Sequence, residues 1–230
     1  NFGEYILLTN FIGYVNIFAQ KYNVKTMGTD KAMQTATHGN ITIINFGMGS
    51  AMAATVMDLL SAITPKAVLF LGKCGGLKKK TVLGDFIIPM AAIRGEGTSN
   101  EYLPQEVPAL PSFRLQRTIS SAMKEFETDY WTGVIFTTNR RVWEHDEVFK
   151  NRLTEARAIG IDMETATLFT AGFANGIPRG ALLLVSDNPM IPSGVKTSES
   201  DKSVTSNFVD LHVNIGIRSL EELRDSGDSV

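Results

Sequence analysis

Residues 158–187 read AIGIDMETATLFTAGFANGIPRGALLLVSD and place a segment with helical spacing between two apolar segments. The apolar segments, 158–161 and 181–185, are typical of buried strands, because a strand covered on both faces is apolar along its whole length. Between them, residues 164–175 repeat apolar side chains every three or four positions, as a helix packed on a sheet does. A glycine and a proline just after this segment form a helix stop signal. The stretch therefore predicts a strand, a helix and a strand.

The same alternation runs through the rest of the chain. Further strands are expected at 5–9, 41–46, 67–71, 86–89 and 133–136. Further helices are expected at 12–22, 51–63, 113–126, 146–156 and 204–223. Strands that alternate with helices of this length predict an α/β layered sheet. No repeat or low-complexity linker divides the 230 residues, so we expect one domain over 1–230. Residues 94–112 lack periodicity and hold three prolines, which indicates a functional or interfacial loop.

Composition and charge limit the function classes. With 43% hydrophobic and 20% charged residues the chain is globular, and its net charge of −2 gives no field that would attract nucleic acid or an anionic membrane. The apolar runs are too short to cross a membrane, so neither nucleic acid nor membrane is an expected partner. The single cysteine, Cys74, excludes an internal disulfide framework and favours a reducing cytoplasm. The first residues show neither a signal-peptide pattern nor an initiator methionine, so we expect residues to be missing upstream.

Two glycine-rich segments follow predicted strands and are expected to be turns. They are Gly47-Met48-Gly49-Ser50 and Gly72-Lys73-Cys74-Gly75-Gly76. Glycines let a ligand approach the backbone, and a helix that begins near Ser50 would offer N–H groups to an anion. The first segment comes near the dinucleotide fingerprint but has Met52 where glycine or alanine belongs. An ordinary tight turn is therefore the main alternative to ligand binding.

Three carboxylates follow predicted strands and are the strongest candidates for chemistry. Asp162 and Glu164 come just after the strand at 158–161, and Asp187 follows the strand at 181–185. Open α/β sheets bind ligands at the carboxyl ends of their strands. Like charges and partial burial at one mouth could raise one pKa enough for general acid catalysis. The alternative is that Asp162 or Asp187 merely caps the following helix or turn.

Other candidates carry less weight. Cys74 could pair with one of the three histidines as a nucleophile, but no spacing supports this and a buried inert thiol is the simpler interpretation. No histidine pair has the spacing of metal ligands, so we expect neither a metal nor another cofactor. Trp131 and Trp143 could stack on a base, or they could belong to the core or to an interface.

Taken together, these segments resemble the nucleoside phosphorylase and nucleosidase superfamily, which includes purine nucleoside and uridine phosphorylases. The resemblance rests on Asp162-Met163-Glu164-Thr165-Ala166, Leu184-Val185-Ser186-Asp187, Phe46-Gly47-Met48-Gly49-Ser50 and Gly72-Lys73-Cys74-Gly75-Gly76. Residues 92–99, residues 137–146 and the stretch ending in Lys196 favour the members that hydrolyse AMP to adenine and ribose 5-phosphate. The match covers nearly the whole chain.

The resemblance implies a fold, an assembly and roles for individual residues. The fold is a three-layer α/β/α arrangement with a mixed, partly closed central sheet, and the assembly is a homohexamer formed as a trimer of dimers. Glu164 would bind the ribose hydroxyls, Met163 would pack on the sugar, and Asp187 would protonate the purine at N7. Protonation helps because adenine leaves poorly as an anion. The remaining substrate-binding candidates are Asp162, Gly49, Gly72, Lys73, Arg94, Thr98, Arg140, Arg141, Trp143, Ser186 and Lys196.

Departures from the family pattern point to water as the nucleophile. Phosphorylases of this superfamily hold inorganic phosphate with arginines at positions where this chain has Gly13 and Phe70, and no arginine precedes Arg94. A phosphate, if bound, would then be the 5′ group of AMP, and its candidate ligands are Arg140, Arg141, Lys73 and Lys196. The alternatives are a purine or uridine nucleoside phosphorylase and a non-catalytic nucleotide-binding module. No residue that activates water is evident.

Overall fold

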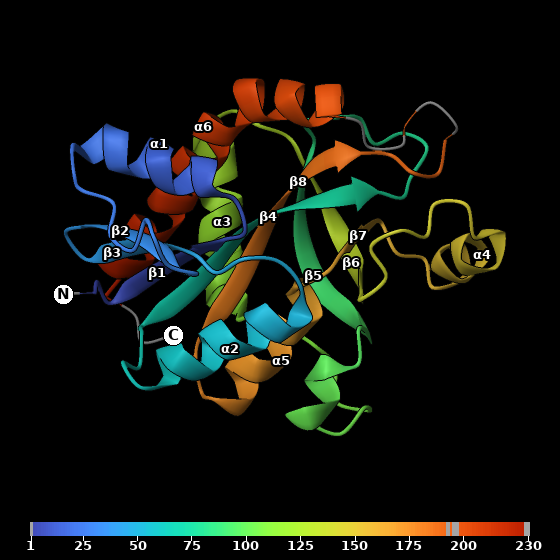
Figure 1. Ribbon diagram of the computed structural model, residues 1–230, viewed down its shortest axis with the longest axis horizontal. Coiled ribbons are helices and arrows are strands. Elements are labelled where there is room, and N and C mark those ends of the chain that lie inside the picture. Colours follow the sequence, from blue (N-terminus) through green and yellow to red (C-terminus); the bar gives the residue numbers. More distant parts are fainter. Residues whose placement is uncertain (1, 192–193, 195–197, 228–230) are drawn as a thin grey trace.

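A computed structural model describes residues 2–191, 194 and 198–227, apart from the side chains of residues 198–206. Within these residues one sheet of eight strands runs in the order β2-β3-β1-β4-β7-β6-β5-β8 (Figure 1). The strands are β1 (Tyr5–Thr9), β2 (Gln34–His38), β3 (Ile41–Asn45), β4 (Ala67–Gly76), β5 (Phe86–Gly95), β6 (Tyr130–Thr138), β7 (Gly160–Asp162) and β8 (Arg179–Asp187). The helices are α1 (Ile12–Tyr22), α2 (Ser50–Ser61), α3 (Phe113–Glu125), α4 (Glu147–Glu155), α5 (Thr165–Ala174) and α6 (Ser198–Asp225), with a 3₁₀ turn, η1, at Thr98–Glu101.

The sheet closes on part of itself. Strand β8 pairs with β5 in antiparallel fashion and with β4 in parallel fashion, so β4, β7, β6, β5 and β8 form a barrel-like unit. Strands β1, β3 and β2 extend from β4 as an open sheet. The expected mixed, partly closed sheet is confirmed.

Helices cover both faces of the sheet and make the fold three-layered. Helices α1, α3 and α6 lie on one face, and α2 and α5 pack together on the other (Figure 1). Successive side chains of a strand point to opposite faces of the sheet, so each strand packs against both helical layers. Phe70 of β4 packs in the cluster under α2 and α5, whereas Leu71 packs in the cluster under α1, α3 and α6. Both residues are almost completely buried, which explains why this strand is apolar throughout.

Most predicted elements are present with shifted ends. Strand β1 and helix α1 have the predicted bounds, β5 and β6 are longer than predicted, and α5 is followed by Gly176 at a φ of 65°, as the stop signal requires. Helix α6 extends beyond the predicted 204–223 at both ends. Strand β2 was not predicted, because its polar sequence QTATH gives no apolar run. It pairs with β3 at the edge of the sheet, and on its other side Thr35 forms an isolated bridge with Met27.

The second glycine-rich segment is not a turn, which corrects the prediction from the sequence. Residues 72–76 continue β4 as a strand, with a register shift between Cys74 and Gly75. A side chain at Gly72 would collide with the ring of Phe70, and one at Gly76 would collide with Thr81. The glycines therefore let a strand pass through a crowded part of the barrel, where larger residues do not fit.

The loop between β5 and α3 belongs to the same packed unit. Ala109 forms an isolated bridge with Ala92 of β5, and residues 98–101 form η1 within the loop. Among the helices of the described residues, none combines the length and the apolar character that crossing a bilayer requires.

Candidate active site

A cleft forms over β4 where the carboxyl ends of two strands, β1 and β7, approach each other along the same edge of β4. Strand β1 runs parallel to β4, with Leu8 beside Phe70, and ends there. Strand β7 runs antiparallel to β4, with Ile161 beside Gly75, and approaches from the other direction. On the opposite edge of β4, β8 runs parallel to it and ends at Asp187. The ends of three strands, β1, β7 and β8, therefore converge over the second half of β4.

This cleft has a volume of about 620 Å³, including space open to solvent, and contains all three predicted carboxylates. Its lining residues are Asn10, Phe11, Met48, Lys73, Cys74, Gly75, Thr138, Arg140, Arg141, Trp143, Glu144, Ile161, Asp162, Met163, Glu164, Ser186 and Asp187.

Glu164 is a buried carboxylate held by the backbone. The N–H of Gly49 donates to its Oε1 at 2.7 Å, and the N–H of Met163 donates to its Oε2 at 3.2 Å. The side chain of Asn10 also forms a hydrogen bond with it. Burial, reinforced by the charge of Asp162, raises the pKa of Glu164 to about 7 in spite of these hydrogen bonds. An N–H group near the start of α2 was expected to bind an anion, and the Glu164 carboxylate of the same chain is that anion.

Asp162 has its oxygens occupied by neighbouring donors. Thr137 donates through Oγ1 to Oδ1 at 2.7 Å, and the N–H of Thr165 donates to Oδ2 at 2.8 Å, with a further bond from the Thr165 hydroxyl. Burial raises the pKa of Asp162 above its ordinary value. These contacts favour the capping alternative: Asp162 fixes the start of α5, and with it Glu164, rather than offering a carboxylate to a ligand.

Asp187 lies on the opposite edge of β4 from Glu164. The Ser186 hydroxyl donates to its Oδ1 at 2.7 Å, and 9% of the residue is exposed. Between the two carboxylates lies Cys74, which is buried, and burial together with the charges of Asp162 and Asp187 raises the pKa of its thiol well above the usual value. The interpretation of Cys74 as an inert buried thiol therefore agrees with the structure.

Basic side chains line the same cleft. Lys73 of β4 is only 8% exposed, and its ammonium group lies 4.6 Å from the ring centroid of Phe11. Arg140 follows β6 and donates from Nη1 to Asp146 at 2.6 Å, which lowers the pKa of Asp146. Arg141 lies next to it and is exposed. The cleft thus combines buried carboxylates with the basic side chains of Lys73, Arg140 and Arg141.

Arg94, a predicted substrate ligand, is not among the residues that line the cleft. Its guanidinium group donates to the carbonyl oxygens of Ser99 at 2.9 Å, Leu103 at 2.7 Å and Val107 at 2.8 Å, and also to that of Pro104. Further bonds reach the side chains of Ser99 and Asn100. A group that organises its own loop in this way has little capacity left for a phosphate.

Three other candidates do not line the cleft, and one cannot be placed. The Thr98 hydroxyl is hydrogen-bonded to Ser50 Oγ at 2.7 Å, Gly72 is buried within β4, and Gly49 contacts the site only through its N–H to Glu164. Lys196 lies outside the described residues.

The two tryptophans occupy different parts of the fold. Trp143 lines the cleft but is only 5% exposed and packs edge-to-face on Phe149, with 5.4 Å between ring centroids. Trp131 does not line the cleft, and its indole N–H donates to Asp85 at 2.9 Å. The sequence analysis missed Asn10 and Phe11, although both directly follow the first predicted strand and so lie at a strand carboxyl end.

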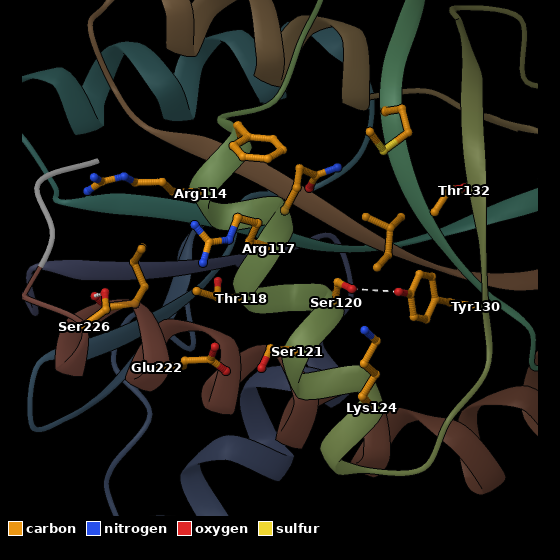
Figure 2. A pocket seen from close by; sticks show the side chains of 15 residues that line it. Arg114, Arg117, Thr118, Ser120, Ser121, Lys124, Tyr130, Thr132, Glu222 and Ser226 are labelled. Atoms are coloured by element: carbon orange, nitrogen blue, oxygen red, sulfur yellow. Dashed lines mark hydrogen bonds between the residues drawn. The ribbon is translucent and has the colours of Figure 1, made fainter.

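A second hollow lies between α3, the start of β6 and the end of α6 (Figure 2). It is larger, about 1230 Å³ including space open to solvent, and is lined by exposed side chains of α3 such as Arg117 and Lys124, with Glu222 across from them. Ser120 and Tyr130 share a hydrogen bond of 2.7 Å at its edge. The smaller cleft holds three buried carboxylates, Asp162, Glu164 and Asp187, whereas the lining of the larger hollow includes only one carboxylate, Glu222, so chemistry rather than size selects the candidate active site. No group of three or more His, Cys, Asp or Glu side chains in the described chain is arranged to hold a metal ion.

A mixed, barrel-like sheet with an acidic cleft over β4 defines a protein with the nucleoside phosphorylase fold. Residues 5–221 match the Phosphorylase superfamily, and the chain belongs to that family. It is 32% identical over 203 residues to AMP nucleosidase of Escherichia coli strain K12, a match covering 84% of this chain and 42% of the relative. It is 28% identical over 162 residues to guanosine phosphorylase of Halorubrum lacusprofundi, covering 70% of this chain and 66% of that protein. The chain thus spans less than half the length of the E. coli relative.

Solved structures agree with this family assignment. The crystal structure of AMP nucleosidase from Bacteroides thetaiotaomicron superimposes with a TM-score of 0.87 at 56% identity, covering 98% of this chain and 90% of that one. Uridine phosphorylase from Vibrio fischeri superimposes with a TM-score of 0.85 at 22% identity, covering 96% and 93%, which shows the shared fold.

Proposed function

We propose that this chain is an N-glycosidase that hydrolyses AMP to adenine and ribose 5-phosphate. The observation that carries the proposal is the combination, in one cleft, of buried Glu164 and Asp187 with the cations Lys73, Arg140 and Arg141. Carboxylates suit a sugar that becomes positively charged as its glycosidic bond breaks, and cations suit a 5′-phosphate. The similarity to AMP nucleosidases named above supports the same substrate.

In the proposed mechanism the two carboxylates act on different parts of AMP. Glu164 binds the ribose hydroxyls and stabilises the developing oxocarbenium charge, and Met163 packs against the sugar. Asp187, oriented by Ser186, donates a proton to adenine N7 as the C1′–N9 bond breaks and its electron pair moves into the base. Water forms the new bond to C1′ and releases a proton to solvent, from which Asp187 is protonated again.

Hydrolysis is proposed rather than phosphorolysis because the cleft lacks an arginine clamp from the amino-terminal half. Position 70 is a phenylalanine buried in the core, position 13 is a glycine in α1, and the first arginine along the chain, Arg94, binds its own loop. We therefore assign the cations of the cleft to the 5′-phosphate of the substrate. The experiment is to incubate AMP and adenosine with and without inorganic phosphate and identify the sugar products. Ribose 5-phosphate formed without added phosphate supports the proposal, whereas strict phosphate dependence or ribose 1,5-bisphosphate as the main product contradicts it.

Lys73 tests the phosphate assignment with a matched control. Lys73→Met keeps the aliphatic stem and removes the charge, so KM for AMP should rise by about 10- to 100-fold, while KM for adenosine changes little. Lys79→Met removes an exposed charge from the loop after β4, outside the cleft, and should leave both constants unchanged. An equal effect of Lys73→Met on both substrates would assign Lys73 to the fold instead.

We also propose a homohexamer built as a trimer of dimers and a cytoplasmic location with a role in purine salvage. Helices α2 and α5 pack together, and Leu59 of α2, Ile63 just after α2 and Phe173 of α5 are 60%, 45% and 56% accessible. Large apolar side chains exposed on this helical layer favour a subunit interface. Light scattering after size-exclusion chromatography should give about six times the chain mass of 25.2 kDa. A monomer mass would refute the assembly.

A further inference from the structure

Asn10 has a feature that the proposed roles of the cleft do not use. It directly follows β1, lines the cleft, and forms a side-chain hydrogen bond with Glu164. A carboxylate accepts hydrogen bonds, so the amide NH₂ of Asn10 is the donor and its oxygen faces elsewhere. That oxygen, Oδ1, is buried and has no hydrogen-bond partner among the described residues.

A buried acceptor without a partner costs about 1–3 kcal/mol, so its presence in a cleft calls for a functional explanation. Asn10 sits where the ends of β1 and β7 meet, on one edge of β4. Asp187, the proposed acid, lies on the other edge of β4 at the end of β8. Strand β4 therefore separates Asn10 from the proposed acid, so the two side chains reach the cleft from different sides.

We propose that Asn10 Oδ1 accepts a hydrogen bond from the attacking water and holds it on the side of the ribose opposite the leaving base. The inference rests on the proposed function, because it assigns a place to the water that hydrolysis requires. In the reaction the water oxygen bonds to C1′, the C1′–N9 bond breaks, and Asp187 supplies the proton that adenine takes up. The amide of Asn10 is not basic enough to take the proton of the water, which passes to solvent. Asn10 is therefore a positioning residue, linked by its NH₂ group to the carboxylate that binds the sugar.

The test uses methanol as a competing nucleophile, because methyl riboside 5-phosphate is stable and its anomeric form records the face of attack. In wild-type enzyme with AMP and about one-tenth methanol by volume, water should dominate the products, and the methyl riboside that forms should be the inverted α anomer. In Asn10→Ala, kcat should fall by about 10- to 100-fold with KM for AMP changed less than threefold, since loss of positioning acts on attack. The ratio of methyl riboside to ribose 5-phosphate should rise several-fold.

Two further variants separate positioning from a structural role. Asn10→Asp keeps an oxygen for water but loses the donor to Glu164, so its product ratio should return toward that of wild type even where KM rises. Asn214 offers a matched control on α6: its Nδ2 donates to Asp210 at 2.9 Å and its Oδ1 is also buried without a partner, but it lies outside the cleft. Asn214→Ala should change neither kcat nor the product ratio.

A failure of the proposed function and a failure of the role of Asn10 give different results in these assays. If wild-type enzyme releases no adenine from AMP in phosphate-free buffer, the proposed function fails. If wild type is active but Asn10→Ala leaves kcat and the product ratio unchanged, or raises only KM, then Asn10 supports Glu164 or the sugar and the inference is overturned.

Discussion

Replacing Glu164 with glutamine should stabilise the folded protein at alkaline pH while lowering its proposed activity. The carboxylate is 2% exposed, and burial raises its pKa from 4.5 to about 7. Glutamine has nearly the same shape and can still accept one of the two backbone N–H bonds, but it carries no charge. The substitution therefore isolates the free energy of holding a negative charge in this cleft.

The free energy of unfolding changes with pH because Glu164 binds its proton more tightly in the folded state than in the unfolded state. Between pH 4.5 and about 7 the folded state holds a proton on Glu164 that the unfolded state has lost, so the free energy of unfolding falls as pH rises through this interval. Each pH unit of the interval corresponds to about 1.4 kcal/mol, which gives a loss of about 3 kcal/mol that is complete above pH 7. Glutamine does not titrate. Relative to wild type, Glu164→Gln should thus gain about 3 kcal/mol of stability on going from pH 4.5 to pH 8.5.

Urea unfolding of both proteins at pH 4.5, 6, 7 and 8.5, followed by tryptophan fluorescence and circular dichroism, measures this difference. The quantity of interest is the change with pH of the stability difference, because titrating groups that do not interact with Glu164 cancel in it. The same variant should lose about 2–4 kcal/mol of transition-state stabilisation, mostly in kcat. A stability difference that is flat across this pH range would refute the burial argument, and a near wild-type kcat would show that Glu164 is structural.

Two further predictions concern Asp187 and Arg94. Asp187→Asn should lower kcat for AMP by about 10²- to 10⁴-fold with affinity retained, and should affect a nitrophenyl riboside 5-phosphate much less, because that leaving group needs no proton; equal slowing of both substrates would give Asp187 a positional role. Arg94→Ala should lower the free energy of unfolding by about 2 kcal/mol, because it leaves the carbonyl groups of its loop without their donor. Unchanged stability with a selective loss of AMP affinity would instead return Arg94 to the substrate site.

The sequence by itself determined the elements and the chemical character of the cleft. Apolar runs and helical spacing are local properties, so β1 and α1 could be predicted to the residue, and a carboxylate that follows a buried strand lies at a strand end whatever the strand order. Asp162, Glu164 and Asp187 could therefore be expected at one mouth. The cation Lys73 could be named but was expected in a turn rather than in a strand.

Only the tertiary structure decided which side chains share the cleft and which are used elsewhere. The register that brings the ends of β1 and β7 together beside β4 joins residues more than 150 positions apart, and no local pattern encodes such a pairing. For the same reason Arg94 was expected to bind substrate, although its loop folds back around it. Whether a polar side chain serves a ligand or its own fold depends on which backbone groups packing leaves unpaired nearby, and that is a property of the three-dimensional arrangement.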